Sequence, residues 1–138
     1  MNKFKKVCVL GLGYIGLPTA AIVASKNTKV LGVDINTDIV KRVNNGQIHI
    51  HEPNLQKIVN KKVKNGQLIA LEKPQEADIY IITVPTPVLK NKKPNLKFVE
   101  EAVKSISNLL KPGNILILES TSPVGTTRNL AKMLSQLR

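Results

Sequence analysis

Three glycines spaced as Gly-x-Gly-x-x-Gly are suited to hold the diphosphate of a dinucleotide. Gly11, Gly13 and Gly16 directly follow the apolar run of residues 7–10. In such a turn the first glycine permits a tight bend, the second lets the backbone approach a diphosphate, and the third lets a helix pack closely on the sheet. A helix beginning near Tyr14 would offer the phosphates its free N–H groups and the partial positive charge of its end.

An acidic residue, Asp34, follows a second apolar run at residues 29–33 and stands 18 positions after Gly16. A carboxylate at the end of a second strand can accept hydrogen bonds from both hydroxyls of the adenosine ribose. It would repel a 2′-phosphate, and no arginine follows at once to receive one. This pattern favours NAD over NADP. The alternative is a surface aspartate that caps a helix starting near Asn36.

A proline-bearing loop, residues 83–87, follows the apolar run 79–82. Pro85 and Pro87 hold this loop rigid and non-helical, so it can present Thr86 to a ligand without moving. The alternative is an ordinary stiff exit from a strand.

A second loop, residues 119–127, lies between another apolar run and the start of a helix. It carries five hydroxyl groups, those of Ser120, Thr121, Ser122, Thr126 and Thr127. Some can cap the helix. Five are more than capping requires, so the others are expected to face phosphate, ribose or a reacting sugar.

Other residues with reactive side chains give weaker signals. Cys8 lies inside the first apolar run and is interpreted as a small core residue rather than a nucleophile. His49, His51 and Glu52 resemble part of a metal cluster, but no third nitrogen or sulfur ligand accompanies them, so no metal is expected.

Strands and helices alternate along the chain and would position these residues. Strands are expected at residues 5–10, 29–33, 68–70, 79–82 and 115–118. Helices are expected at 14–26, from near Asn36 to near Asn45, over the stretch 55–63 that Asn65 and Gly66 stop, and at 96–110 and 125–138. This alternation predicts an α/β fold: a Rossmann-type, doubly wound parallel sheet with helices on both faces, forming one domain over residues 1–138. In such sheets ligands bind beyond the carboxyl ends of the strands, where the glycine turn and both loops fall.

The bulk composition narrows the class of partner. The chain has 138 residues and a net charge of +12, enough length for one domain with a real core. Its lysines are scattered, and two Phe, two Tyr and no Trp offer little stacking surface, so no nucleic acid is expected. There is no long apolar span or leader, so we expect no membrane contact and a cytoplasmic location. A single cysteine excludes an internal disulfide.

These motifs resemble those of the nucleotide-sugar 6-dehydrogenases, the family of UDP-glucose and UDP-N-acetylmannosamine dehydrogenases. The matching stretches run in order over nearly the whole chain, at residues 11–18, 32–36, 48–53, 84–87 and 119–127. Residues 48–53 and 119–125 are most similar to the N-acetylmannosamine branch, although His51 stands where that branch often has an apolar residue. UDP-glucose-type specificity therefore stays open.

The resemblance implies NAD as cofactor and a UDP-sugar substrate whose C6 alcohol is oxidised to a carboxylate with two NAD, in polysaccharide precursor biosynthesis. It implies that Tyr14 and Ile15 contact the cofactor diphosphate through their backbone. Thr86 and Thr127 would bind the cofactor further along, and Thr121 would position a water or hydroxyl during the oxidation.

The resemblance covers about the first third of a typical member, roughly one domain. We therefore expect an N-terminal NAD-binding domain. The family's catalytic cysteine, its lysine and asparagine, the central dimerising helix and the second nucleotide-binding domain would lie beyond Arg138. Cys8 cannot replace that thiol because its strand places it in the core, and the chemistry needs a thiolate. The chain alone is expected to lack the overall oxidation.

Two other functions remain open: a stand-alone NAD-binding module that senses the cofactor or pairs with a partner chain, and a related β-hydroxyacid dehydrogenase, which the two downstream loops disfavour. The truncated sheet is expected to leave a strand edge or an apolar helix face uncovered. Self-association, as a homo-oligomer, or marginal stability would follow.

Overall fold

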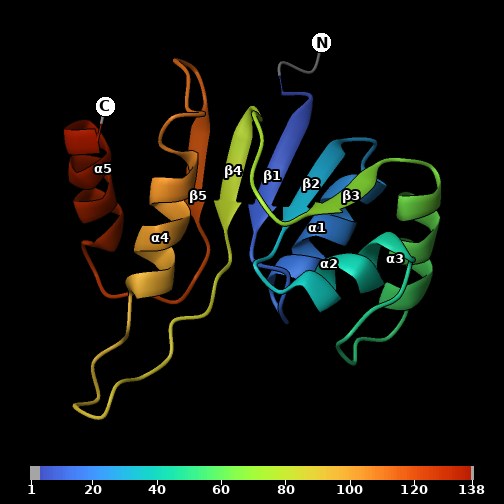
Figure 1. Ribbon diagram of the computed structural model, residues 1–138, viewed down its shortest axis with the longest axis horizontal. Helices are drawn as coiled ribbons and strands as arrows, with labels where there is room; N and C mark the ends of the chain where they lie inside the picture. The colour runs from blue at the N-terminus through green and yellow to red at the C-terminus, as the bar shows by residue number, and fades with distance from the viewer. Residues whose placement is uncertain (1–3, 138) are drawn as a thin grey trace.

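A five-stranded parallel sheet forms the centre of the structure, a computed structural model that describes residues 4–137 (Figure 1). Its strands are β1 (Lys6–Leu10), β2 (Lys29–Val33), β3 (Leu68–Leu71), β4 (Ile79–Ile82) and β5 (Ile115–Leu118). They pair in the order β3-β2-β1-β4-β5, every pair parallel. The chain crosses from one half of the sheet to the other between β3 and β4, so β1 and β4 meet at the point where ligands of doubly wound sheets bind. The predicted fold class is confirmed.

Helices cover both faces of the sheet (Figure 1). One face is packed by α1 (Gly16–Ser25), α2 (Thr37–Asn44) and α3 (Leu55–Lys64), and the other by α4 (Lys97–Ile106) and α5 (Thr126–Leu137). Strand β1 shows why two cores form, because its side chains alternate between the faces. Val7 and Val9 join the core under α1, whereas Cys8 and Leu10 join the core under α4. A strand buried on both sides needs the unbroken apolar run seen in its sequence.

Two helices are shorter than the sequence predicts. The helix expected from residue 14 begins at Gly16, because residues 14 and 15 form a turn. The helix expected to reach residue 110 ends at Ile106. Leu109 and Leu110 both donate to the Ile106 carbonyl, at 2.8 and 3.2 Å, so this last turn is tightened and the apolar spacing continues without an α-helix.

The two edges of the sheet differ. At the β3 edge the side-chain amide of Asn44 imitates a neighbouring strand, donating to the Ala70 carbonyl at 2.9 Å and accepting from the Ala70 N–H at 2.8 Å. At the other edge, Ile115 and Ile117 of β5 are 41% and 42% exposed, on the face opposite α5. Among the described residues no strand pairs with the outer edge of β5, as predicted, and one of its faces exposes apolar side chains; self-association stays a prediction.

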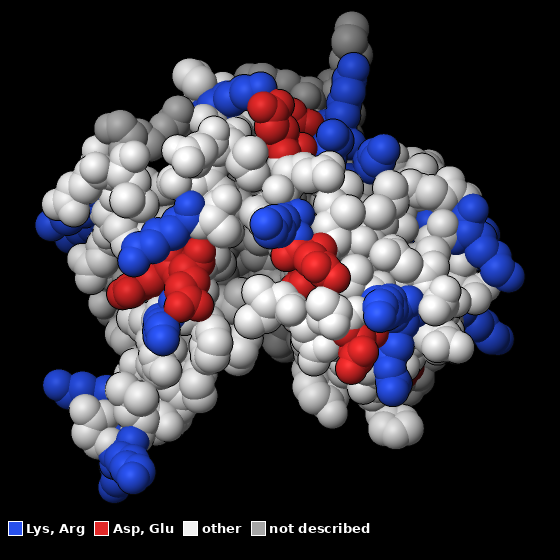
Figure 2. Space-filling view, viewed as in Figure 1, with Lys and Arg blue, Asp and Glu red and all other residues white. Residues whose placement is uncertain are grey.

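Charged side chains are spread over the surface. On the face shown in Figure 2, Lys and Arg side chains occur in many separate places, several of them beside Asp or Glu. Within the described residues, no helix combines the length and apolar character that crossing a membrane requires.

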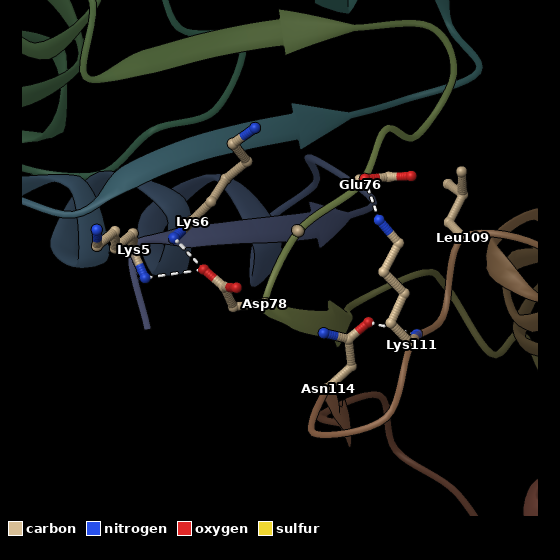
Figure 3. A pocket seen from close by; sticks show the side chains of 8 residues that line it. Lys5, Lys6, Glu76, Asp78, Leu109, Lys111 and Asn114 are labelled. Carbon is tan, nitrogen blue, oxygen red and sulfur yellow. Dashed lines mark hydrogen bonds and ion pairs between the residues drawn. The ribbon is translucent and has the colours of Figure 1, made fainter. Parts of the chain in front are cut away.

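At the amino ends of the strands a single carboxylate joins β1 to β4 (Figure 3). Asp78 directly precedes β4, and its Oδ2 accepts hydrogen bonds from the backbone N–H groups of Lys5 and Lys6 at 2.8 and 2.9 Å. These bonds, aided by the two lysine charges, hold the pKa of Asp78 below its usual value. The carboxylate borders a cavity of about 240 Å³ that also includes Glu76 and Lys111, whose ion pair measures 2.7 Å. This cavity lies at the amino ends of the strands, whereas the glycine turn lies at their carboxyl ends.

Asp78 should make folding stability sensitive to acid. Because its pKa is lower in the folded state, its contribution is complete above the unfolded carboxyl pKa of about 3.9 and is lost as the pH falls through the folded-state value. We expect Asp78→Asn to lower the free energy of unfolding at neutral pH by about 1 kcal/mol. Below about pH 4, where Asp78 is itself protonated, the difference should shrink.

Urea unfolding at a series of pH values measures this effect. Glu72→Gln is the matched control, because Glu72 is an exposed acid without a hydrogen bond or ion pair among the described residues. A constant difference between Asp78→Asn and the native chain at every pH would contradict the prediction.

Candidate functional site

The glycine turn has the tight geometry that its spacing predicts. Gly11 follows β1 with a φ of 101°, in the region that favours glycine. Its N–H donates to the Val33 carbonyl at the end of β2, at 2.8 Å. A Cβ added to Gly11 would lie 2.9 Å from the Thr83 carbonyl oxygen. Both the backbone conformation and the close approach of β4 therefore require glycine here.

The other two glycines serve different purposes. A Cβ on Gly16 would lie 1.6 Å from the Gly11 carbonyl oxygen and 2.5 Å from the Thr83 hydroxyl. The close packing predicted at Gly16 is thus between α1 and the turn itself. A Cβ on Gly13 would meet no protein atom within 4 Å. The space beside Gly13 is open, as a bound diphosphate would need.

Backbone N–H groups at the start of α1 are available to a ligand. Leu17 donates to the Gly13 carbonyl at 3.1 Å, but within the described residues the N–H groups of Gly13, Tyr14 and Ile15 donate to no acceptor. The Tyr14 and Ile15 side chains are 69% and 56% exposed, and the first turn of α1 has no acidic residue. Unpaired N–H groups at the positive end of a helix suit an anion.

Asp34 lies beside this turn, and both its oxygens are already used. Oδ2 accepts from the Leu12 N–H at 2.9 Å, and Oδ1 accepts from the Asn36 N–H at 2.9 Å. Asn36, and not Asp34, caps α2, because its side chain accepts from Asp38 and Ile39. The helix-cap alternative is therefore wrong. A carboxylate has about four acceptor positions, so about two remain for ribose hydroxyls.

The loop after β4 carries a residue that sequence reasoning missed. Thr83 is 7% exposed, and its hydroxyl lies 2.7 Å from the Gly11 carbonyl oxygen and 3.0 Å from that of Leu10. The signal was a threonine directly after an apolar strand, where a buried hydroxyl must find a partner. Thr86, the residue predicted to face a ligand, is partly buried, and its hydroxyl has no hydrogen bond within the described residues.

The five hydroxyls of residues 119–127 divide into two groups. Ser120 donates to the Val84 carbonyl at 2.8 Å and Thr126 to the Pro123 carbonyl at 2.8 Å, so these two stabilise the loop itself. Thr121 and Thr127 are exposed and, like Ser122, make no side-chain hydrogen bond to the described residues. Thr127 is the second residue of α5. These three hydroxyls are free to meet a ligand, and their contacts with one stay predictions.

The remaining candidates do not join this site. Cys8 is fully buried, and burial raises the pKa of its thiol to about 12, which confirms it as a core residue. His49, His51 and Glu52 lie on the loop between α2 and α3, and neither ring nitrogen of His49 has a hydrogen-bond partner. Within residues 4–137 no three His, Cys, Asp or Glu side chains lie close enough together to hold a metal ion.

Comparison with known proteins identifies this site's relatives. The model of the UDP-glucose/GDP-mannose dehydrogenase family, NAD binding domain, matches residues 5–138. A UDP-N-acetyl-D-mannosamine dehydrogenase from Campylobacter jejuni is 58% identical over all of this chain and 34% of its own length. An NDP-N-acetyl-D-galactosaminuronic acid dehydrogenase from Ralstonia nicotianae is 49% identical over 98% of this chain and 32% of its own.

The solved structure of a UDP-D-ManNAc dehydrogenase from Pyrococcus horikoshii has the same fold. It superposes with a TM-score of 0.91 and 36% identity over 96% of this chain and 32% of that one. The chain therefore spans about a third of the length of the relatives that it matches.

Gly13 and Gly16 should respond differently to alanine. Gly13→Ala should leave the melting temperature unchanged, because its Cβ meets no protein atom, yet weaken NAD binding by about tenfold or more by filling the space beside the N–H groups. Gly16→Ala should destabilise the fold by about 2 kcal/mol or more, because its Cβ collides with backbone. Thermal unfolding and calorimetric titration with NAD measure both. Unaltered NAD affinity in Gly13→Ala would overturn the placement of the diphosphate.

Proposed function

Since this chain belongs to the UDP-glucose/GDP-mannose dehydrogenase family and corresponds to its NAD-binding domain, we propose that it is the N-terminal domain of a UDP-N-acetyl-D-mannosamine 6-dehydrogenase-like enzyme. The whole enzyme would oxidise the sugar C6 alcohol to a carboxylate with two NAD, in the synthesis of polysaccharide precursors. The observation that carries the proposal is that the N–H groups of Gly13, Tyr14 and Ile15, which donate to no acceptor among the described residues, follow directly on Leu12, whose N–H donates to the Asp34 carboxylate.

The residues at the carboxyl ends of the strands fit NAD. The N–H groups of Tyr14 and Ile15 would hold the diphosphate beside Gly13, and the remaining acceptor positions of Asp34 would bind the adenosine ribose. Thr86, which follows β4, and Thr127, which follows β5, would contact the cofactor further along, on the β4–β5 side of the sheet. When bound, NAD supplies the nicotinamide ring that accepts hydride from the sugar.

Thr121 is the residue of this chain assigned to the reacting end. Thr121 follows β5 and is exposed, and its hydroxyl makes no hydrogen bond to the described residues. It would hold a water or a sugar hydroxyl by hydrogen bonding.

The preference for N-acetylmannosamine rests on similarity. Relatives named for that sugar are 49–58% identical to this chain, and the relative named for N-acetylgalactosaminuronic acid is 49% identical. UDP-glucose is the alternative substrate. Because NAD and nucleotide sugars are cytoplasmic metabolites, the proposal places the protein in the cytoplasm.

The overall oxidation needs a thiol that this chain does not offer. A thiohemiacetal and then a thioester must form on a thiolate. The single cysteine of the chain is Cys8, which is enclosed beneath α4 with a pKa of about 12. The domain alone would therefore bind the cofactor without completing the reaction.

Cofactor choice tests the role of Asp34. We expect NAD to bind at least about tenfold more tightly than NADP, because a carboxylate repels a 2′-phosphate. Asp34→Asn should narrow this preference by removing the charge while keeping one acceptor oxygen. Calorimetric titration of the native chain and of Asp34→Asn with NAD and with NADP measures this preference, and tighter binding of NADP by the native chain would refute the assignment.

Turnover of the isolated chain tests the missing thiol. Incubation with UDP-N-acetylmannosamine and NAD should produce no sugar carboxylate, although NAD binds, because the second oxidation needs an accessible thiolate. The measurement is chromatography of the nucleotide sugars after hours at high protein concentration. Carboxylate that the native chain forms and that Cys8→Ala abolishes would show that the chain does supply its own nucleophile.

A further inference from the structure

One peptide group links the end of β4 to the carboxylate that follows β2. The carbonyl of the Gly11–Leu12 peptide accepts from the Thr83 hydroxyl at 2.7 Å. The N–H of the same peptide donates to Asp34 Oδ2 at 2.9 Å. This peptide is therefore held at both ends, by a hydroxyl on one side and a carboxylate on the other.

The Thr83 hydroxyl has little freedom to do anything else. The residue is 7% exposed, and its N–H is already bonded to the Leu10 carbonyl at 2.9 Å. The nearest alternative acceptor is that same Leu10 oxygen, at 3.0 Å. The space that the hydroxyl occupies exists because Gly16 has no side chain, since a Cβ there would lie 2.5 Å from Thr83 Oγ1.

We propose that Thr83 is a positioning residue for the cofactor, acting through the Gly11–Leu12 peptide to aim Asp34 at the adenosine ribose. The hydroxyl fixes the plane of the peptide, so the Leu12 N–H points at Asp34 Oδ2. One oxygen is held there and the other by Asn36, which sets the direction of the carboxylate's remaining acceptor positions. The inference rests on the proposed contact between Asp34 and the ribose.

The proposed role of Thr83 predicts how loss of its hydroxyl changes the affinities for NAD and for NADP. If Thr83 only stabilised the fold, its loss would weaken all dinucleotides equally. If it aims Asp34, its loss must weaken NAD more than NADP, because only NAD has the 2′-hydroxyl that the carboxylate binds.

Thr83→Val is the direct test, because valine keeps the shape and removes the hydroxyl. We expect NAD affinity to fall about fivefold to tenfold. NADP affinity should change less than about twofold, so the preference for NAD narrows. Thr83→Ser, which keeps the hydroxyl, should retain the native preference. Ser107→Ala is the matched control: Ser107 is also 7% exposed and bonded to a backbone carbonyl, that of Lys104 at 2.8 Å, away from the turn.

Calorimetric Kd values for NAD and NADP, with melting temperatures, separate the outcomes. A native preference for NAD that is unchanged in Thr83→Val overturns this inference and leaves the proposed function standing. A native chain that does not bind NAD, or prefers NADP, overturns both. Thr83→Ser behaving like Thr83→Val also overturns the inference, because the methyl group would then be responsible. If Thr83→Val does not fold, Thr83→Cys gives the same comparison. We expect its preference for NAD over NADP to narrow, and an unchanged preference would refute the inference.

Discussion

The absence of two side chains allows the central part of this fold to close. At Gly11 and Gly16 an added Cβ would lie 2.9 Å or less from atoms of Thr83 or of the turn. The ends of β1 and β4 and the start of α1 can therefore approach to van der Waals contact. Without that approach α1 would stand off the sheet, and its free N–H groups would no longer lie beside Asp34. Packing of the core and recognition of the cofactor therefore both depend on the close approach of β1, β4 and α1 at these two glycines.

Much of this architecture could be predicted from local sequence. Apolar runs such as residues 79–82 and 115–118 became strands with the predicted limits. The first strand is buried on both faces of the sheet, which requires an uninterrupted apolar stretch, whereas Ile115 and Ile117 of the second are exposed on one face. Helix ends were less certain. The apolar spacing of residues 96–110 continues past Ile106, where the chain tightens into a turn that keeps the same side chains packed.

The partners of the hydroxyl groups could not be predicted. Thr83 bonds to residues more than seventy positions earlier, and Ser120 to Val84. A sequence shows that a buried hydroxyl needs an acceptor, but only the pairing of β1 with β4 and of β4 with β5 decides which carbonyl is near. The five hydroxyls of residues 119–127 illustrate this: two of them stabilise the loops, and the sequence does not distinguish these from the three left free.

The unequal edges of the sheet limit how copies of this domain could associate. At the β3 edge the Asn44 amide already uses both hydrogen-bonding groups of Ala70, whereas within residues 4–137 no strand pairs with the outer side of β5. The Asn44 amide thus blocks part of the β3 edge, and the β5 edge of the described chain is the more open of the two. Pairing of β5 with β5 would use this open edge in both copies, and further growth through β3 would first have to displace the Asn44 amide.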